Sequence, residues 1–315
     1  VIQHRADRIQ VVLLAHHKVV GTMARGGVYQ AGTRVGGNVL TEDDRHLGLQ
    51  EGMLQRHHFQ LAACDGRRTG HIVQPPARHQ IIGQRLSPQQ LTGHAVLLVD
   101  LDTQGNATRH VGEEIGGEAL EAATDPNREI PLEPEIRSFG FDLITGGRYL
   151  LGAVSHIQQR RVPSVVLRRL LRPLREQYDV ILLDTPPTLG LISINAIVSA
   201  THLLIPVQLE GGAVDGLDAV LETADELRDI NPELELLGSV PVMHDRRTAI
   251  SKMLLSAVQE MDYARPLDAV ISRNVSVAEA YLAEEPVSVY NSNSQGARDF
   301  KKLAEEVERR LRGEW

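Results

Sequence analysis

The sequence predicts an α/β fold: a mostly parallel sheet with helices on both faces. The first observation is a pair of short apolar runs, Val96–Asp100 and residues 180–184, that each end in an aspartate. Continuous runs of Val, Ile and Leu are typical of strands buried on both faces of a parallel sheet. The second observation is that such runs alternate with helical patterns from residue 95 to residue 315, which indicates strands joined by crossover helices.

The remaining elements follow in chain order. Further strands are expected at 141–144, 203–207 and 236–243, with a strand end at 270–271. Helical spacing of apolar residues predicts helices at 165–177, 192–200, 214–229, 250–261, 275–282 and 295–312. Pro173 should interrupt the first of these helices. Residues 124–137 contain three prolines and predict a loop, and residues 11–14 have the composition of a short strand.

Charge divides the chain near residue 94. The whole chain of 315 residues has a net charge of −8 and 42% apolar residues, so a packed core is expected. Residues 1–94 carry 11 Lys and Arg against 6 Asp and Glu, a net of +5, and 9 of the 13 histidines. Residues 95–315 have a net charge of −13. We therefore expect two parts: an unassigned N-terminal segment, 1–94, and an α/β domain, 95–315.

The N-terminal segment has no sustained helical or strand period, and six glycines crowd residues 21–37. Its histidines match no zinc-binding spacing, and the single cysteine offers no pair to support them. Three interpretations stay open: a poorly ordered extension, a segment outside the native reading frame, and an unrelated module fused to the domain.

The strand-end aspartates are the main candidates for chemistry. Ligands of parallel sheets bind beyond the carboxyl ends of the strands, where Asp100, Asp102 and Asp184 are expected to lie. Such carboxylates can hold Mg²⁺ or orient a water for phosphoryl transfer. Each aspartate alone is more typical of a cap of the following helix than of a ligand. The two motifs together, Asp-Leu-Asp-Thr-Gln-Gly-Asn and Asp-Thr-Pro-Pro, favour the functional interpretation.

These motifs resemble those of ParA/Soj-type partitioning ATPases. The segment 100–108 is similar to their second motif, with Thr103 where a proline is usual, and 178–190 to their Walker B strand and turn. Further similarity runs through 205–210, 216–217, 245–248, 271–275 and 294–297, so the resemblance covers about residues 91–315.

The resemblance implies a P-loop fold that binds ATP and Mg²⁺ and forms a homodimer with ATP. Asp102 matches the carboxylate that positions the attacking water, and Asp184 matches the Walker B residue that holds Mg²⁺ through water. Other positions are expected to contact the nucleotide: Asp100, Gln104, Gly105, Asn106, Pro186 and, at the adenine, Met243.

The resemblance also implies a cytoplasmic, nucleoid-associated protein that binds DNA non-specifically and is regulated by a ParB-like partner. Phosphate contacts by a few arginines give sequence-independent, salt-sensitive binding. The candidates are Arg246, Arg247, Arg273 and Arg298, and each could instead pair with neighbouring carboxylates. Ser276 stands where the family often has an arginine. No apolar run is long enough to span a bilayer, and the last helix lacks a membrane-binding face, so no membrane partner is expected.

The sequence departs from the family at the phosphate loop. The family has a Lys-Gly-Gly-x-Gly-Lys-Thr loop 25 to 30 residues before the second motif, but residues 70–79 contain no lysine and two prolines, which lack the N–H donors of such a loop. The nearest echo, Arg-Gly-Gly at residues 25–27, lacks the lysine. We therefore expect the first strand and phosphate loop to be missing or replaced. The function predicted is a DNA-partitioning ATPase; the alternative is a non-hydrolysing relative that binds DNA or a partner.

Overall fold

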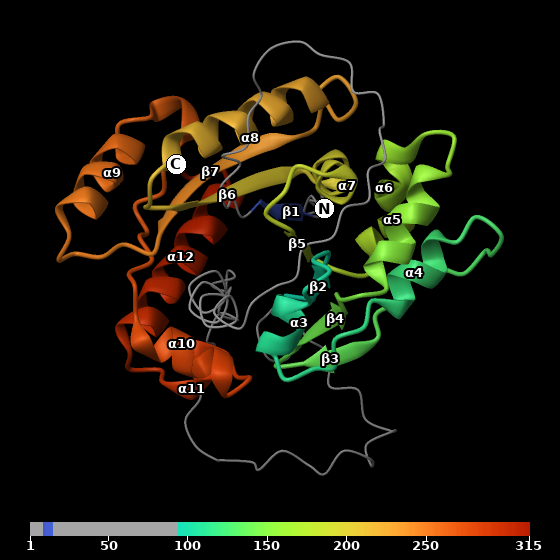
Figure 1. Ribbon diagram of the computed structural model, residues 1–315, viewed down its shortest axis with the longest axis horizontal. Helices are drawn as coiled ribbons and strands as arrows, with labels where there is room; N and C mark the ends of the chain where they lie inside the picture. Colours follow the sequence, from blue (N-terminus) through green and yellow to red (C-terminus); the bar gives the residue numbers. More distant parts are fainter. Residues whose placement is uncertain (1–8, 15–93) are drawn as a thin grey trace, which may run out of the picture.

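The computed structural model describes residues 9–14 and 94–315 (Figure 1). Their strands form one seven-stranded sheet in the order β3-β4-β2-β5-β1-β6-β7. Adjacent strands pair in parallel except β3 with β4, which pair antiparallel. The bounds are β1 Ile9–Leu14, β2 Val96–Asp100, β3 Ile136–Ser138, β4 Phe141–Ile144, β5 Val180–Thr185, β6 His202–Gln208 and β7 Glu235–Val242. The predicted fold class is confirmed.

Strand β1 lies at the centre of the sheet, between β5 and β6. Val12 faces Leu183 in the register, and the hydroxyl of Thr185 donates to the carbonyl of Leu13 at 2.6 Å. Val11, Val12 and Leu13 are at most 2% exposed. An apolar strand can fill this place because both of its faces are covered.

The expectation that the first strand is missing is therefore wrong. Residues 11–14 have the strand composition noted in the sequence, but they pair with residues 180–185 rather than with a neighbouring segment. Strand β1 lies within the segment predicted to be separate, although it belongs to the sheet of the following domain. For residues 15–93, which lie outside the described part of the chain, the division near residue 94 stays a prediction.

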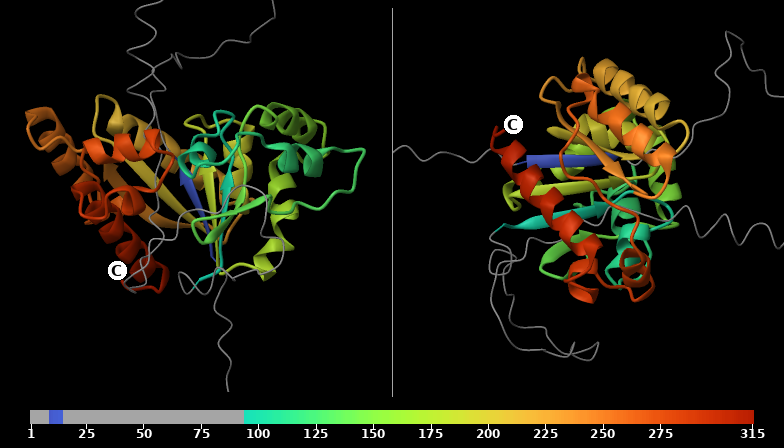
Figure 2. Two further views of the ribbon diagram at one scale, coloured as in Figure 1. Left: turned by 90° about the horizontal axis from the view of Figure 1, so that it is seen from below. Right: turned by 90° about the vertical axis from the view of Figure 1, so that its left-hand side faces the viewer.

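Helices cover both faces of the sheet (Figures 1 and 2). The larger apolar cluster contains residues of α4 Glu118–Thr124, α5 Leu150–Gln158, α6 Val166–Leu171, α7 Leu191–Ser199, α8 Ala213–Leu227 and α9 Ala249–Gln259. The second cluster contains residues of α10 Val275–Leu282, α11 Val287–Tyr290 and α12 Gln295–Leu311. In β6, Leu203 and Ile205 pack in the first cluster and Leu204 in the second, because successive side chains of a strand point to opposite faces.

The predicted elements differ from the structure in a few places. The helix expected at 165–177 is divided into the 3₁₀ turn Pro163–Val165, α6 and the 3₁₀ turn Leu174–Glu176, with the break at Pro173 as predicted. Helix α5 was not predicted from the sequence. The strand end expected at 270–271 is reduced to an isolated bridge between His244 and Ser272. The short helix α3, Asn106–His110, follows directly on the second motif.

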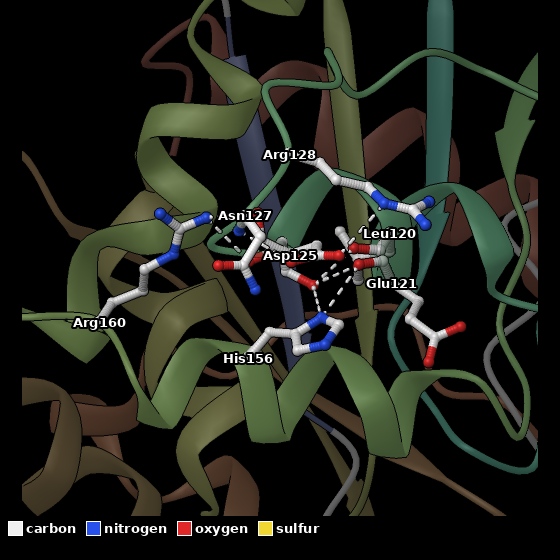
Figure 3. A network of polar contacts seen from close by, with 8 residues as sticks. Leu120, Glu121, Asp125, Asn127, Arg128, His156 and Arg160 are labelled. Atoms are coloured by element: carbon white, nitrogen blue, oxygen red, sulfur yellow. Dashed lines mark hydrogen bonds and ion pairs between the residues drawn. The ribbon is translucent and has the colours of Figure 1, made fainter.

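The carboxyl end of α4 is held by side chains from α5 and from just beyond it (Figure 3). Arg160 donates to the carbonyls of Thr124 and Asp125 at 2.9 and 3.0 Å. His156 Nδ1 lies 3.2 Å from the carbonyl of Glu121, and it must carry the proton of this bond because a carbonyl only accepts. These bonds satisfy carbonyls that the end of a helix leaves without an intrahelical partner. They tie α4 to α5 in one layer.

Candidate nucleotide site

Asp100 is a fully buried carboxylate at the end of β2. One of its oxygens accepts the backbone N–H of Asp102 at 3.0 Å. The other accepts the backbone N–H and the hydroxyl of Thr108, at 2.8 and 2.7 Å. The two bonds from Thr108 join the end of the strand to α3, and the bond from Asp102 fixes the start of the turn between them. We therefore interpret Asp100, expected from the sequence to contact nucleotide, as the residue that holds the second motif in shape.

Asp102 and Asp184 lie at the carboxyl ends of the neighbouring strands β2 and β5. Asp100 and Asp184 are register partners, and the N–H of Leu101 donates to the carbonyl of Asp184 at 2.8 Å. Asp102 follows one residue later, and its carboxylate accepts the N–H of Gln104 at 3.0 Å. Both aspartates are 3% exposed. The structure thus brings the two predicted carboxylates to the same edge of the sheet.

The turn after Asp102 requires two glycines. Gly105 has φ of 59°, a left-handed conformation that favours glycine, and a Cβ there would lie 2.9 Å from the carbonyl oxygen of Gly146. A Cβ on Gly146 would lie 2.4 Å from Asp100 Cγ. The N–H of Gly146 also donates to the hydroxyl of Thr108 at 2.9 Å. The loop after β4 is therefore packed directly against the second motif.

Tyr281 connects α10 to this motif and was not singled out in the sequence. Its hydroxyl donates to Asn106 Oδ1 at 3.3 Å, and its ring lies edge-on to His110 with the ring centres 5.0 Å apart. Thr108 and Gly146 were also missed. Thr108 lies in the segment 100–108 that resembles the second motif, but its bond to Asp100 was not predicted. Tyr281 and Gly146 belong to elements far away in the chain, and the local sequence does not indicate that they meet the motif.

The other residues expected at the nucleotide lie along the same edge. Gln104 is exposed, and Asn106 and Pro186 are half-buried. Met243 is half-buried with φ of 59° at the end of β7. Strand β7 is three places from β5 in the sheet, about 14 Å at the usual strand spacing. Met243 does not join the two carboxylates, and its place at the adenine stays a prediction.

Three of the four predicted DNA-binding arginines gather near Asp245. Arg247 donates to the Asp245 carboxylate from Nε at 3.1 Å, and the N–H of Arg273 donates to the carbonyl of His244 at 3.0 Å. Hydrogen bonds from Arg247 hold the pKa of Asp245 below its usual value. Arg246 is exposed. Arg273 also approaches Glu210, at 3.8 Å, so this group is partly neutralised by carboxylates.

Arg298, the fourth, is exposed in the first turn of α12. It donates to the carbonyl of Asn293 at 2.5 Å and to Gln295 at 3.0 Å. The next residue, Asp299, accepts the N–H of Ser272 at 3.0 Å, so the start of α12 packs beside the segment that contains Arg273.

Residues 70–79, at the spacing expected of a phosphate loop, and residues 25–27, which faintly resemble one, lie outside the described residues. The position of β1 shifts the expected place of such a loop, because a phosphate loop follows a strand of the sheet directly. Directly after β1 the sequence reads Ala15-His16-His17-Lys18, and Lys18 is the only lysine before Lys252. These residues also lie outside the described part.

The donor set fits Mg²⁺ carried with a nucleotide. Mg²⁺ is bound by one or two protein carboxylates and takes its other oxygens from water and phosphate. Asp184 and Asp102 supply carboxylates of this kind. Within residues 9–14 and 94–315, no group of three or more His, Cys, Asp or Glu side chains could hold a metal ion.

The fold and the paired carboxylates define a class of nucleotide-binding α/β proteins, and comparison with known proteins agrees. Residues 87–236 match a family model described as an AAA domain. The chain is 35% identical over 228 residues to the chromosome-partitioning ATPase Soj of Thermus thermophilus, covering 70% of this chain and 85% of that protein. It is 32% identical over 229 residues to the chromosome partitioning protein ParA of Caulobacter vibrioides, covering 68% and 83%.

The chain belongs to the ParA/Soj-type family of partitioning ATPases. Among solved structures it is similar to cobyrinic acid a,c-diamide synthase from Mycobacterium smegmatis with bound ATP analog and magnesium. That likeness has 31% identity and a TM-score of 0.51, and covers 60% of this chain and 79% of that one. In the described part of the chain, no helix has the length and apolar character to cross a membrane.

Proposed function

We propose that this protein is a DNA-partitioning ATPase that binds Mg-ATP at the carboxyl edge of β2 and β5. The observation that carries the proposal is the position of Asp184 at the end of β5 and of Asp102 just beyond the end of the adjacent strand β2, in a chain of the ParA/Soj family. Magnesium, when bound with ATP, neutralises developing charge on the phosphates.

Each residue has a separate task in this proposal. Asp184 would hold the ion, and Asp102 would accept a hydrogen bond from a water and so orient it toward the phosphates. Asp100 and Thr108 keep Asp102 in place through the bonds described above. Gln104, Gly105 and Asn106 would line the γ-phosphate. A water bound to the buried carboxylate of Asp102 would be better oriented than a water in bulk, because the carboxylate is held in a fixed position.

The remaining parts of the proposal follow from the family. The protein forms a homodimer with ATP, binds DNA non-specifically through Arg246, Arg247, Arg273 and Arg298, and responds to a ParB-like partner. It acts in the cytoplasm on the nucleoid. The exposure of Arg246, Arg247 and Arg298 supports contact with phosphates, whereas the acidic neighbours of Arg247 and Arg273 oppose it.

The test is Mg-ATP binding and hydrolysis by the full chain and by two variants. Asp184→Asn should weaken Mg-ATP binding more than it weakens ATP binding without the ion. Asp102→Asn should retain Mg-ATP binding and lose most of the hydrolysis. If the full chain fails to bind Mg-ATP at millimolar concentration, the ATPase is excluded and the non-hydrolysing relative remains.

A further inference from the structure

Tyr281, in the last turn of α10, contacts both ends of the short helix that follows the second motif. Its hydroxyl donates to Oδ1 of Asn106, the first residue of α3, at 3.3 Å. Its ring lies edge-on to His110, the last residue of α3, with the ring planes at 82°. Helices α3 and α10 lie side by side (Figure 1). A residue 175 positions later in the chain thus reaches a side chain of the motif.

The packing of α10 fixes the position of Tyr281. The helix begins at Asn274, whose side chain accepts the backbone N–H of Ser276 at 2.9 Å and so caps the first turn. Val277 and Ala280 are buried in the second apolar cluster. A side chain on a capped and packed helix is placed more precisely than one on a loop. Tyr281 can therefore hold its partner in a defined orientation.

The backbone of α3 is held by other contacts, which come from the ends of β2 and β4. The backbone N–H and the hydroxyl of Thr108 both donate to Asp100. Gly105, in its left-handed conformation, lies so close to the loop after β4 that a Cβ would be 2.9 Å from the carbonyl oxygen of Gly146. These contacts place the backbone at Asn106. The contact with Tyr281 is made to the Asn106 side chain itself.

The bond from Tyr281 selects which end of the Asn106 amide can meet a phosphate. A side-chain amide has an oxygen that only accepts hydrogen bonds and an NH₂ group that only donates them. When Oδ1 accepts from Tyr281, Nδ2 is the end of the amide that can donate to a phosphate oxygen. An amide turned the other way would present its own oxygen to the phosphate, and two acceptors cannot form a hydrogen bond.

We propose that Tyr281 is a positioning residue that orients the Asn106 amide so that Nδ2 donates to the γ-phosphate of ATP. The inference rests on the proposed function, which supplies both the nucleotide and the place of Asn106 beside the γ-phosphate. It adds a residue from outside the second motif, on an element that no nucleotide motif marks. Because ADP has no γ-phosphate, the bond from Tyr281 should strengthen binding of ATP and leave binding of ADP unchanged.

The experiment measures the dissociation constants of the full chain for β,γ-imido-ATP and for ADP, each with Mg²⁺, by titration calorimetry. Tyr281→Phe removes the hydroxyl and keeps the ring beside His110. It should weaken binding of the ATP analogue by roughly 3- to 10-fold, the usual effect of one hydrogen bond, and change ADP binding by less than about 2-fold. The matched control is Tyr290→Phe, which removes a hydroxyl from an exposed tyrosine on the neighbouring helix α11 and should leave both constants unchanged.

A second comparison tests whether the hydroxyl acts through Asn106. In the Asn106→Ala background, Tyr281→Phe should cause no further loss of affinity for the ATP analogue, because the amide that the hydroxyl orients is absent. Thermal unfolding of the same proteins serves as the check on folding. Tyr281→Phe should change the Tm by less than about 3 °C, since the packed ring is retained.

The proposal is overturned if Tyr281→Phe retains the wild-type affinity for the ATP analogue. It is also overturned if the variant weakens the ATP analogue and ADP equally, because the hydroxyl would then only stabilise the fold, or if its effect is the same with and without the Asn106 amide. In each of these cases the wild type still binds Mg-nucleotide, so the proposed function stands. A wild type that binds neither nucleotide overturns both proposals.

Discussion

Replacing Asp100 by asparagine separates a structural carboxylate from a catalytic one. The side chain of Asp100 is 0% exposed and accepts from three donors: two backbone N–H groups and one hydroxyl. An asparagine has the same shape, but one of its two ends is an NH₂ group, which must face a donor in either orientation. A hydrogen bond to a charged group contributes about 1.5–3 kcal/mol, so losing one and adding a donor–donor contact should cost about 2–4 kcal/mol.

The assay is thermal unfolding followed by circular dichroism, with Asp102→Asn as the matched control. At about 2–4 °C per kcal/mol for a domain of this size, Asp100→Asn should lower the Tm by roughly 4–16 °C. Asp102→Asn keeps an oxygen that can accept the N–H of Gln104, so its Tm should change by less than about 3 °C while hydrolysis is lost. If the Tm of Asp100→Asn instead changes by less than about 3 °C while ATP binding is lost, the structural role of Asp100 is refuted and a direct contact with the nucleotide is favoured.

Three further changes test other contacts. Gly146→Ala would place a Cβ 2.4 Å from Asp100 Cγ and should destabilise the fold by about 1–3 kcal/mol in thermal unfolding. Arg160→Gln removes the charged donor from two carbonyls at the end of α4 and should cost about 1–3 kcal/mol, measured in the same way. Burial, aided by the charge of Arg246, lowers the pKa of His244 below its usual value. The contribution of neutral His244 to stability is therefore complete above about pH 6.5 and is lost as pH falls through the lower pKa of the folded state. The measurement is the free energy of unfolding of His244→Gln and of the wild type as a function of pH.

Matched controls keep these outcomes interpretable. Gly211→Ala places a Cβ with no heavy atom within 4 Å in the described structure, so it should leave the Tm nearly unchanged. Arg161→Gln removes an exposed arginine next to Arg160 and should cost less than about 0.5 kcal/mol. If the controls and the test variants unfold alike, the packing and capping arguments fail. If the free energy of unfolding of His244→Gln depends on pH in the same way as that of the wild type, the buried histidine does not titrate as described.

Local sequence predicted the strands that form the site but not their central partner. Val96–Asp100 and the run ending at Asp184 are continuous apolar stretches bounded by polar residues, so their place at the middle of a parallel sheet follows from composition. Residues 11–14 carry the same local pattern. Their pairing with residues about 170 positions later leaves no trace in the intervening sequence, and the strand was therefore expected to be missing.

The roles of the two carboxylates in the second motif were harder to separate. Asp100 and Asp102 are one residue apart, and both precede a helix, so either could cap, bind or catalyse. The distinction depends on Thr108, whose hydroxyl meets Asp100 only because α3 turns back over the end of β2. Helix α5 was missed because Gly152, in its first turn, weakens the helical pattern of its sequence.

The central position of β1 has a consequence for synthesis of the protein. The strand leaves the ribosome before any of its partners exist, because residues 180–185 and 202–204 are made later. At about 5–20 residues per second, the interval between residue 14 and residue 185, where the first partner strand ends, is roughly 9–34 s. For that time Val11, Val12 and Leu13, which end up almost fully enclosed, have no native partner in the sheet. Slowing translation between these two segments should therefore increase the demand for chaperones that bind short apolar stretches.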